Sequence, residues 1–330
     1  MTALIPNWNG GARLARVIDD LRSQRLQPER ILVVDNGSSD GSAEAARTAG
    51  CDVIAMGSNM GFAAAVNTGI RDSRTPLVAI INNDVELDAA WLEKLVAAMA
   101  GGGAWFAAPK LRSLSRAALL DGSYDLVSSA RTAWRCAAGK ADAPVWNRGG
   151  EIWSAPMTAA LFRRTLFDRV GMLDEQFGSY LEDADLGIRC ALAGCAGVYV
   201  PDAVAGHWGS ATLGVWNPET VRLIARNQML LVWKYRPNGW LSRAGWSILV
   251  GQLLWGALAW RHAGRKGLQS WWRGKHEGLA ARGRFPHFRN RGEPDRLFAA
   301  EQARILELQR EGGADGYWRL YFLLTEGRIV

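Results

Sequence analysis

Residues 31–41 read Ile-Leu-Val-Val-Asp-Asn-Gly-Ser-Ser-Asp-Gly, and this stretch decides the fold class. Its first four residues are apolar and largely β-branched, which predicts a buried strand. The polar turn from Asp35 to Asp40 contains residues that favour the start of a helix, and a small-residue helical stretch from Gly41 to Gly50 follows. A strand, a turn and a helix in this order are the repeating unit of an α/β protein.

The same unit repeats further along the chain. We expect strands at 51–54 and 77–81 and helices at 61–71 and 89–100. This alternation predicts a mostly parallel sheet with flanking helices, in which ligands bind at the carboxyl ends of the strands. Asp35 and Asp84 both fall at such strand ends, so we expect a ligand site there.

Composition and charge divide the chain. Its 330 residues are 48% hydrophobic, enough for one large domain with an appendage or for two domains. The net charge is +7, but residues 233–292 hold twelve Lys and Arg and one acid, Glu277, which gives +11 and leaves −4 (7 − 11) for the rest. Seven of the sixteen tryptophans lie in the same segment. We therefore expect a catalytic domain at 1–216 and a mainly helical region at 217–330 that contains this basic, Trp-rich segment.

Several classes of protein are disfavoured. The four cysteines show neither a CxxC pair nor a metal-binding spacing, and the first residues do not resemble a signal peptide. We therefore expect reduced thiols in the cytoplasm. The chain has no P-loop and no Gly-x-Gly-x-x-Gly motif, which argues against those two kinds of nucleotide site.

Residues 82–86, Asn-Asn-Asp-Val-Glu, deliver a carboxylate and two amides at the end of a predicted strand. Oxygen ligands of this kind suit a hard divalent cation that keeps open positions for substrate phosphates. The alternative is a strand-to-helix turn in which Asn and Asp act as caps.

A second acidic cluster, Glu182-Asp183-Ala184-Asp185, lies between apolar residues, and His207 follows it among small residues. Carboxylates in apolar surroundings are costly to bury unless a cation or a proton transfer keeps them there. The pattern indicates a base together with a metal or phosphate site. The alternative is an exposed helix start capped by acids, with a histidine in the core.

Five motifs occur in order along the chain, namely 6–10 (Pro-Asn-Trp-Asn-Gly), 33–41, 59–67, 82–84 and the segment 153–194. Together they resemble the inverting glycosyltransferases of family 2, over about residues 3 to 235. The subgroup to which the chain is most similar contains rhamnosyltransferases and related enzymes of bacterial polysaccharide assembly. The resemblance implies a GT-A fold, which is α/β and Rossmann-like with a mostly parallel sheet, followed here by a helical, membrane-associating C-terminal extension.

The resemblance also implies roles for single residues. Asp84 resembles the last acid of the metal-binding Asp-x-Asp motif, although Asn82 replaces the first acid, and His207 resembles a further metal ligand. A divalent cation, Mg²⁺ or Mn²⁺, is therefore implied. The residues implied to bind the nucleotide sugar are Pro6, Asn7, Asn9, Asp35, Asn36, Gly61, Asn67, Asn82 and Asn83.

Asp183 resembles the catalytic base, because inversion needs one carboxylate behind the acceptor hydroxyl and a cation on the departing diphosphate. Glu182 is the alternative base. Asp185 either positions the acceptor or caps the following helix. Trp153 and Trp208 are further candidates for acceptor binding.

These roles describe a metal-dependent inverting transferase. It would move a sugar from dTDP-rhamnose or a UDP-sugar to a glycan or lipid-linked hydroxyl in cell-surface polysaccharide assembly. The alternative is a catalytically inactive subunit that binds nucleotide sugars in a polysaccharide assembly complex. A nucleotidyltransferase is disfavoured, because its Gly-rich, Lys-containing N-terminal signature is absent.

The C-terminal region has its own pattern. Asn217-Pro218-Glu219 is a favourable helix start, residues 295–311 predict an amphipathic helix, and we expect the apolar segment 317–324 to dock on the body of the protein. Residues 244–260 carry no charge, but as a helix they would span only roughly 26 Å, less than the roughly 30 Å of bilayer hydrocarbon.

Tryptophan and basic residues around 244–260 suit a helix that lies in the headgroup region on anionic lipid. We therefore expect a peripheral protein on the cytoplasmic, inner face of the cell membrane. Packing of this helix on the catalytic domain, or on a second copy in a homo-oligomer, is the alternative. We expect no nucleic-acid partner, because no nucleic-acid-binding module accompanies the basic segment.

Overall fold

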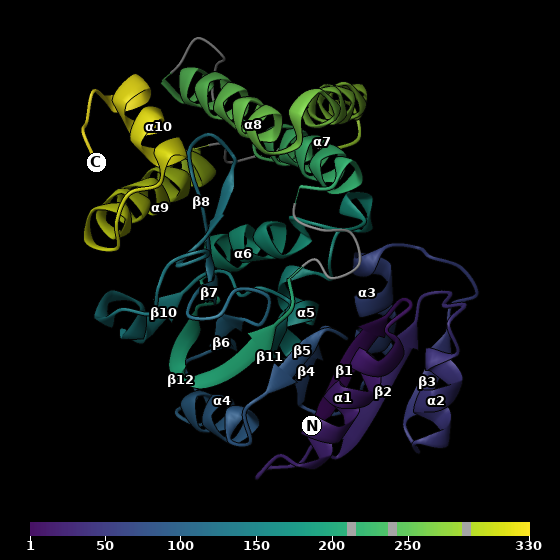
Figure 1. Ribbon diagram of the computed structural model, residues 1–330. Coiled ribbons are helices and arrows are strands. Elements are labelled where there is room, and N and C mark those ends of the chain that lie inside the picture. The colour runs from purple at the N-terminus through teal and green to yellow at the C-terminus, as the bar shows by residue number, and fades with distance from the viewer. Residues whose placement is uncertain (210–215, 237–242, 286–291) are drawn as a thin grey trace. The chain divides into compact units, whose positions relative to one another are not determined.

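The computed structural model describes residues 1–209, 216–236, 243–285 and 292–330. The chain forms two compact units (Figure 1). The first unit comprises Met1–Asp125 and Ala137–Gly209, and the second comprises Leu126–Cys136 and Ser210–Val330. All four cysteines are buried thiols.

The first unit is built on one sheet with the strand order β10-β12-β6-β11-β4-β1-β2-β3, to which β5 adds beside β12 and β7 beside β6. The strands are β1 (Thr2–Asn7), β2 (Arg30–Asp35), β3 (Asp52–Ala55), β4 (Leu77–Ile81), β5 (Val85–Leu87), β6 (Phe106–Ser113), β7 (Leu120–Gly122), β10 (Gly150–Ile152), β11 (Ala159–Arg163) and β12 (Gly197–His207). A separate two-stranded sheet pairs β8 (Asp125–Val127) with β9 (Ala133–Arg135).

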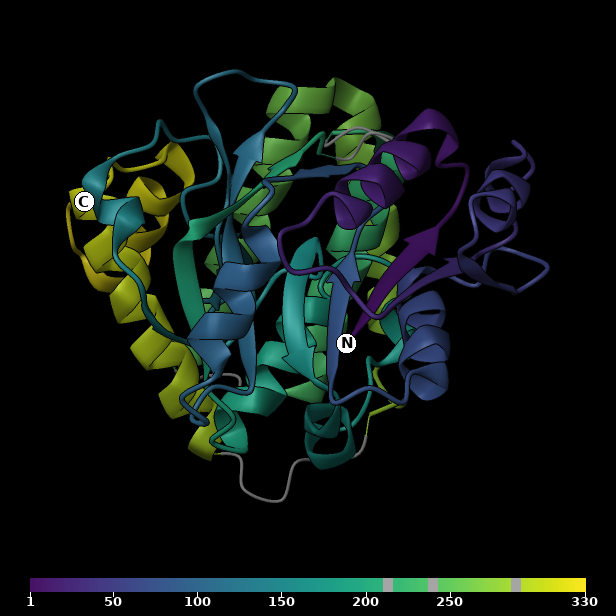
Figure 2. The same ribbon diagram turned by 90° about the horizontal axis from the view of Figure 1, so that it is seen from below.

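Helices cover both faces of the main sheet. They are α1 (Gly11–Arg22), α2 (Ser42–Thr48), α3 (Phe62–Asp72), α4 (Trp91–Met99), α5 (Arg164–Val170) and α6 (Glu182–Leu192), with short 3₁₀ helices η1 (Pro144–Asn147) and η2 (Glu175–Phe177). Alternate strand residues point to opposite faces, so Ile5 and Val33 pack with α1, α2 and α4, whereas Leu4 and Leu32 pack with α3, α5 and α6. Figure 1 shows α4 and α6 on opposite sides of β6 and β12, and Figure 2 looks from the α4 side.

The prediction of a mostly parallel α/β sheet is confirmed. Strands β3, β2, β1 and β4 are parallel neighbours, and β12 is parallel to β6. The expected strand at 77–81 is β4, and the other expected strands and helices of this region differ from the observed ones by one or two residues at their ends. The alternation did not predict β11, which runs antiparallel between β4 and β6.

The second unit is mainly helical, with α7 (Pro218–Lys234), α8 (Arg243–Ala280), α9 (Gly292–Glu311) and α10 (Gly316–Glu326). The predicted start of α7 is confirmed, because the Asn217 side chain accepts a hydrogen bond of 2.9 Å from the backbone N–H of Glu219. Gly264, with φ 58° and ψ −147°, interrupts α8 and divides it into two segments. In the described part of the chain, no helix combines the length and the apolar character needed to span a membrane.

Two buried basic side chains organise the second unit. The guanidinium of Arg131 is fully buried, donates to the carbonyl of Tyr235 (3.0 Å) and to Asp295 Oδ1 (2.7 Å), and lies over the ring of Phe298. The ammonium of Lys275 on α8 is also buried and donates to the carbonyl of Ala225 on α7 and to two glutamine side chains. Buried polar groups need such partners, so these contacts fix residues 126–136 and α7 within the second unit.

Candidate functional site

A network of amides and carboxylates lies at the carboxyl ends of β1 and β2. These strands are parallel with Asn7 opposite Asp35, and Asn7 Nδ2 donates to Asp35 Oδ1 at 3.1 Å and to Ser42 Oγ at 2.9 Å. Asn83, which follows β4, donates through Nδ2 to Asn7 Oδ1 at 2.9 Å. Three of the predicted donor-binding residues are therefore brought together at one edge of the sheet, where α/β proteins bind their ligands.

Two loops are tied to this edge. The backbone N–H of Asn9 donates to Ser38 Oγ, and Asn9 Oδ1 accepts from the backbone of Ser39, both at 2.9 Å. Asn36 accepts from the backbone N–H of Met60 at 2.8 Å and donates to the carbonyl of Gly61 at 3.1 Å. Sequence reasoning missed the serine hydroxyls, because serine in a turn is an ordinary capping residue.

Gly61 lies at a close approach between two backbone segments. It has φ +90°, and a Cβ atom there would lie 3.0 Å from Cα of Gly178. Next to it, the backbone N–H groups of Phe62 and Ala63 donate to Ser179 Oγ and to the carbonyl of Gly178. The start of α3 is thus fixed against the loop that precedes α6.

The predicted base lies at the start of α6. Tyr180 and Leu181 have φ of 73° and 67°, a left-handed conformation that is costly for residues other than glycine and that often marks functional sites. Glu182 is buried, whereas Asp183 is half-buried and accepts a 2.8 Å hydrogen bond from the backbone N–H of Ala184. Of the two carboxylates, Asp183 is the more accessible.

Two predicted residues have their polar atoms engaged inside the protein. Asp185 is fully buried and pairs with Arg189, which also donates to two backbone carbonyls before η2. Asn67 exchanges two hydrogen bonds with the backbone of Leu173 and donates to Glu175 Oε1. These contacts hold α6 and α3 in place. Direct binding of acceptor by Asp185 and of donor by Asn67 stays a prediction.

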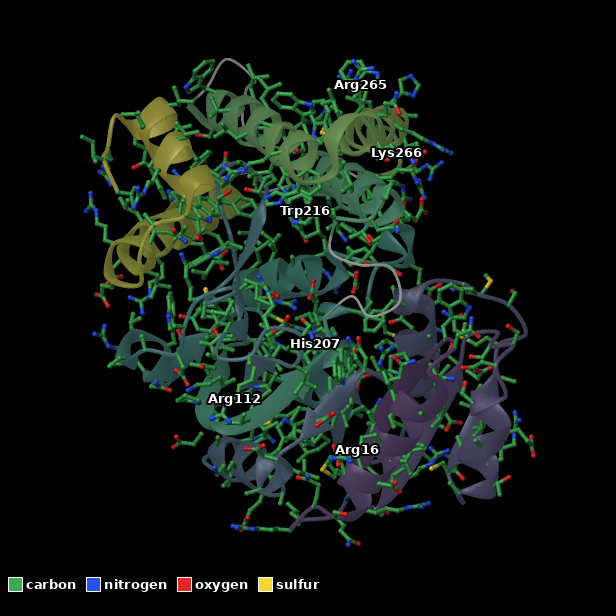
Figure 3. All side chains as sticks on the ribbon, viewed as in Figure 1. Arg16, Arg112, His207, Trp216, Arg265 and Lys266 are labelled. Atoms are coloured by element: carbon green, nitrogen blue, oxygen red, sulfur yellow. The ribbon has the colours of Figure 1, made fainter. Side chains whose placement is uncertain are left out.

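Asp84 and His207 meet across the antiparallel pair of β5 and β12. His207 pairs with Val85, and the backbone N–H of Trp208 donates to the carbonyl of Asp84 at 3.1 Å. His207 Nε2 lies 3.2 Å from Asp84 Oδ1, and its Nδ1 lies 2.8 Å from Asp121 Oδ2 (Figure 3 labels His207). Burial alone would lower the pKa of His207, but the hydrogen bonds and charges of the two carboxylates outweigh it and raise the pKa to about 9.

The comparisons with known proteins agree with this geometry. Residues 2–171 match the model of the family described as Glycosyl transferase family 2, which is more than half of the chain. The chain belongs to glycosyl transferase family 2. The transferase is 29% identical over 249 residues to N-acetylglucosaminyl-diphospho-decaprenol L-rhamnosyltransferase of Mycobacterium tuberculosis, an alignment that covers 65% of this chain and 79% of that protein.

Solved structures show the GT-A-like fold of the transferase. The mannosyltransferase PcManGT from Pyrobaculum calidifontis, in complex with GDP-Man and Mn²⁺, superposes with a TM-score of 0.52 at 17% identity over 98% of this chain and 85% of that chain. A fragment of S. aureus TarS in complex with UDP-GlcNAc gives 0.53 at 15% identity over 99% and 92%. The family and the fold together make this chain a nucleotide-sugar glycosyltransferase.

The residues at 82–84 fit a divalent cation. Among the described residues, no hydrogen-bond donor reaches the buried Asn82 Oδ1, which leaves this oxygen able to bind a ligand. Asp84 and His207 add one carboxylate oxygen and one imidazole nitrogen beside each other. Within the described residues, no group of three or more His, Cys, Asp or Glu gathers as a metal site. A cation here would therefore take further oxygen ligands from the diphosphate and from water, as Mg²⁺ commonly does.

The remaining predicted residues have less defined roles. Trp208 is 38% exposed, and the Arg13 guanidinium lies 5.9 Å from the centre of its ring. Pro6 is buried in β1 opposite Val34, and Trp153 is half-buried just after β10. Their contacts with donor or acceptor stay predictions. The contact of Asp121 with His207 was not predicted from the sequence.

Proposed function

We propose that the protein is an inverting, metal-dependent glycosyltransferase that moves a sugar from a nucleotide-sugar donor to a glycan or lipid-linked hydroxyl. The observation that carries the proposal is the contact between Asp84 and His207. This pair of metal-type ligands lies directly beyond Asn83, which is bonded to the Asn7–Asp35 network. A donor whose base or ribose contacts Asp35 would place its diphosphate toward this pair.

A divalent cation held by Asp84 and His207, with Asn82 nearby, would offset the negative charge that develops on the departing diphosphate. Asp183 then accepts the proton of the acceptor hydroxyl. The acceptor oxygen forms a bond to the anomeric carbon as the bond from that carbon to the diphosphate breaks, so the configuration inverts and a nucleoside diphosphate leaves. The half-buried position of Asp183 supports this role over Glu182, which is buried.

The similarity to a rhamnosyltransferase supports dTDP-rhamnose as one donor to test, and the UDP-GlcNAc bound to TarS supports a UDP-sugar as the other. The name of the same relative supports a lipid-linked acceptor of cell-surface polysaccharide assembly. A catalytically inactive subunit that binds nucleotide sugars is the alternative. The presence of both a pair of possible metal ligands, Asp84 and His207, and a half-buried Asp183 favours the enzyme.

The second unit supports a location on the cytoplasmic face of the membrane. Large apolar side chains are exposed on both segments of α8, namely Trp246, Leu249, Leu253, Trp260, Leu268, Trp272 and Leu279. A hollow of about 190 Å³ lies between the segments, lined by Leu253, Gly256, Ala257, Trp260, Leu268 and Trp271. The exposed Arg265 and Lys266 project outward near the bend (Figure 3), so anionic lipid would meet apolar and cationic groups together.

The deciding experiment is a panel of nucleotide sugars, including dTDP-rhamnose and UDP-sugars, scored by release of the nucleoside diphosphate with Mg²⁺, Mn²⁺ or chelator. We expect metal-dependent release with one donor, faster when a glycan or lipid-linked acceptor is present. Metal-dependent binding of a donor with no release under any condition, with each acceptor class tested, would favour the inactive subunit instead.

A further inference from the structure

Asp121 is the extra residue of a β-bulge beside the proposed metal pair. On the strand pair β6–β7, Leu111 pairs with Gly122 and Arg112 pairs with Leu120, so the register shifts at Asp121. Gly122 has φ 146°, a conformation that favours glycine. Bulges occur next to active sites, where they redirect a side chain. Here the redirected side chain reaches His207.

The geometry gives the two carboxylates different tasks. Asp121 Oδ2 lies 2.8 Å from Nδ1 of His207, and Asp84 Oδ1 lies 3.2 Å from Nε2, so they contact opposite edges of one imidazole ring. The side chains of His207, Asp84 and Asp121 are only 9%, 13% and 18% exposed. A carboxylate that accepts the Nδ1–H keeps the proton on that nitrogen and leaves Nε2, which lies beside Asp84 Oδ1, as the nitrogen that can exchange its proton for a cation.

The pairing of strands explains how this arrangement is held. β7 pairs with β6, β6 is parallel to β12 with Ser113 opposite His207, and β12 pairs with β5. Asp121, His207 and Asp84 are thus presented by a continuous hydrogen-bonded part of the sheet. A scaffold of this kind fixes the ring more firmly than a loop would.

We propose that Asp121 is a positioning residue that sets the tautomer and the orientation of His207 for binding of a divalent cation. The proposal rests on the proposed metal site at Asp84 and His207. In this role Asp121 contacts neither donor nor acceptor, and its effect on the cation passes through His207.

Titration calorimetry of Mn²⁺ into the protein, in the presence of UDP and then of dTDP, tests the proposal. We expect Asp121→Asn to weaken Mn²⁺ binding about 10- to 100-fold, the range usual for removal of an outer-shell partner. In the His207→Ala background the same change should have no further effect, because Asp121 then has no ring to position. Glu151→Gln is the matched control, since Glu151 is exposed on β10 and pairs with the opposite end of β12.

Mn²⁺ affinity of Asp121→Asn within twofold of the wild type overturns the proposal, and so do additive losses in the double variant, which would make Asp121 an independent ligand. If His207→Ala itself leaves Mn²⁺ affinity unchanged, the proposed metal site fails instead.

A measurement on the wild type covers the case in which Asp121→Asn does not fold. ¹⁵N NMR of histidine-labelled protein with Mg²⁺ and nucleotide, with the His207 signal identified by its loss in His207→Ala, should show the Nδ1–H tautomer. The Nε2–H tautomer overturns the proposal.

Discussion

His207 Nε2 lies 3.2 Å from Asp84 Oδ1, because β5 and β12 pair antiparallel with Val85 opposite His207. Neither residue has a neighbour in the sequence that would reveal this contact. It places a nitrogen and an oxygen ligand at the same end of the sheet as the Asn7–Asp35 network, and the first prediction concerns this pair.

Asp84→Ala and His207→Ala should each weaken Mn²⁺-dependent nucleotide binding by at least about tenfold. Removing a ligand should cost no less than removing an outer-shell partner, which typically costs about 10–100-fold. Calorimetry with and without Mn²⁺ measures this. Metal-free nucleotide binding should stay unchanged, and the exposed His276→Ala should behave as the wild type. Donor affinity of the wild type that is independent of metal would contradict the prediction.

Asp183→Asn should lower kcat about 10²- to 10⁴-fold, the usual contribution of a general base, because the amide keeps the shape but cannot accept the proton. Donor affinity should change little. Glu182→Gln is the matched comparison and should have the smaller effect on kcat, because Glu182 is buried. Wild-type turnover in Asp183→Asn would exclude Asp183 as the base, and a larger loss in Glu182→Gln would transfer the role to Glu182.

Gly61→Ala should lower turnover, although Gly61 is neither a proposed metal ligand nor the proposed base. The added Cβ would lie 3.0 Å from Cα of Gly178 and would push apart the start of α3 and the loop before α6. Gly57→Ala is the control: its φ is +79°, but a Cβ there meets nothing within 4 Å. Both variants should lose about 1–2 kcal/mol of stability from the left-handed backbone, and only Gly61→Ala should also lose kcat. Equal kcat values in the two variants would show that the close contact between Gly61 and Gly178 does not affect turnover.

Lys275 should make stability depend on pH. Burial lowers the pKa of Lys275 well below 10.5, and its acceptors, the carbonyl of Ala225 and the side-chain oxygens of Gln228 and Gln252, are neutral. Between the folded pKa and 10.5 the unfolded chain binds the proton more tightly, so this residue's contribution to the free energy of unfolding rises with pH, by up to about 1.4 kcal/mol per pH unit.

Urea unfolding of wild type and Lys275→Met at several pH values between 7 and about 9.5 isolates this contribution, because other titrating groups cancel in the difference. The difference, wild type minus variant, should rise with pH. A difference that stays flat or falls would mean that the ammonium is not destabilised by burial.

Membrane binding should depend on the exposed tryptophans of α8. Trp260 and Trp272 are 59% and 67% exposed, whereas Trp255 packs against Trp216. Trp260→Ala with Trp272→Ala should weaken flotation with anionic liposomes even at low salt, because apolar insertion is lost. Arg265→Glu with Lys266→Glu should instead weaken mainly the salt-sensitive part of liposome binding, since headgroup attraction is screened over about 8 Å at physiological ionic strength.

Met60→Ala, at a 60% exposed apolar residue of the first unit, is the control for the tryptophan variants. Wild-type protein that stays in the soluble fraction with anionic vesicles at low salt would exclude this route to the membrane. The apolar face of α8 would then be an interface for packing or for a second copy.

Much of the local structure could be predicted. The apolar run at 77–81 is β4, and Asn217 and Pro218 begin α7, because short-range hydrophobic pattern and capping act over a few residues. The placement of Asp35 and of residues 82–84 at strand ends was predictable for the same reason. The engagement of Asn67 with Leu173 and of Asp185 with Arg189 was not, since those hydrogen bonds depend on how the helices pack.

By itself, then, the sequence determined the α/β class, the strand ends that hold the donor-type residues and the charge asymmetry of the helical region, since each follows from residues that are neighbours along the chain. Only the tertiary structure decided that Asp121 and Asp84 contact the two nitrogens of the His207 imidazole, and that Gly61 packs closely against the loop before Asp183. Both depend on strand pairing and close backbone contact between distant segments. A bulge on β7 aims Asp121, and a bulge is set by the register of the partner strand, which the residues of β7 alone do not specify.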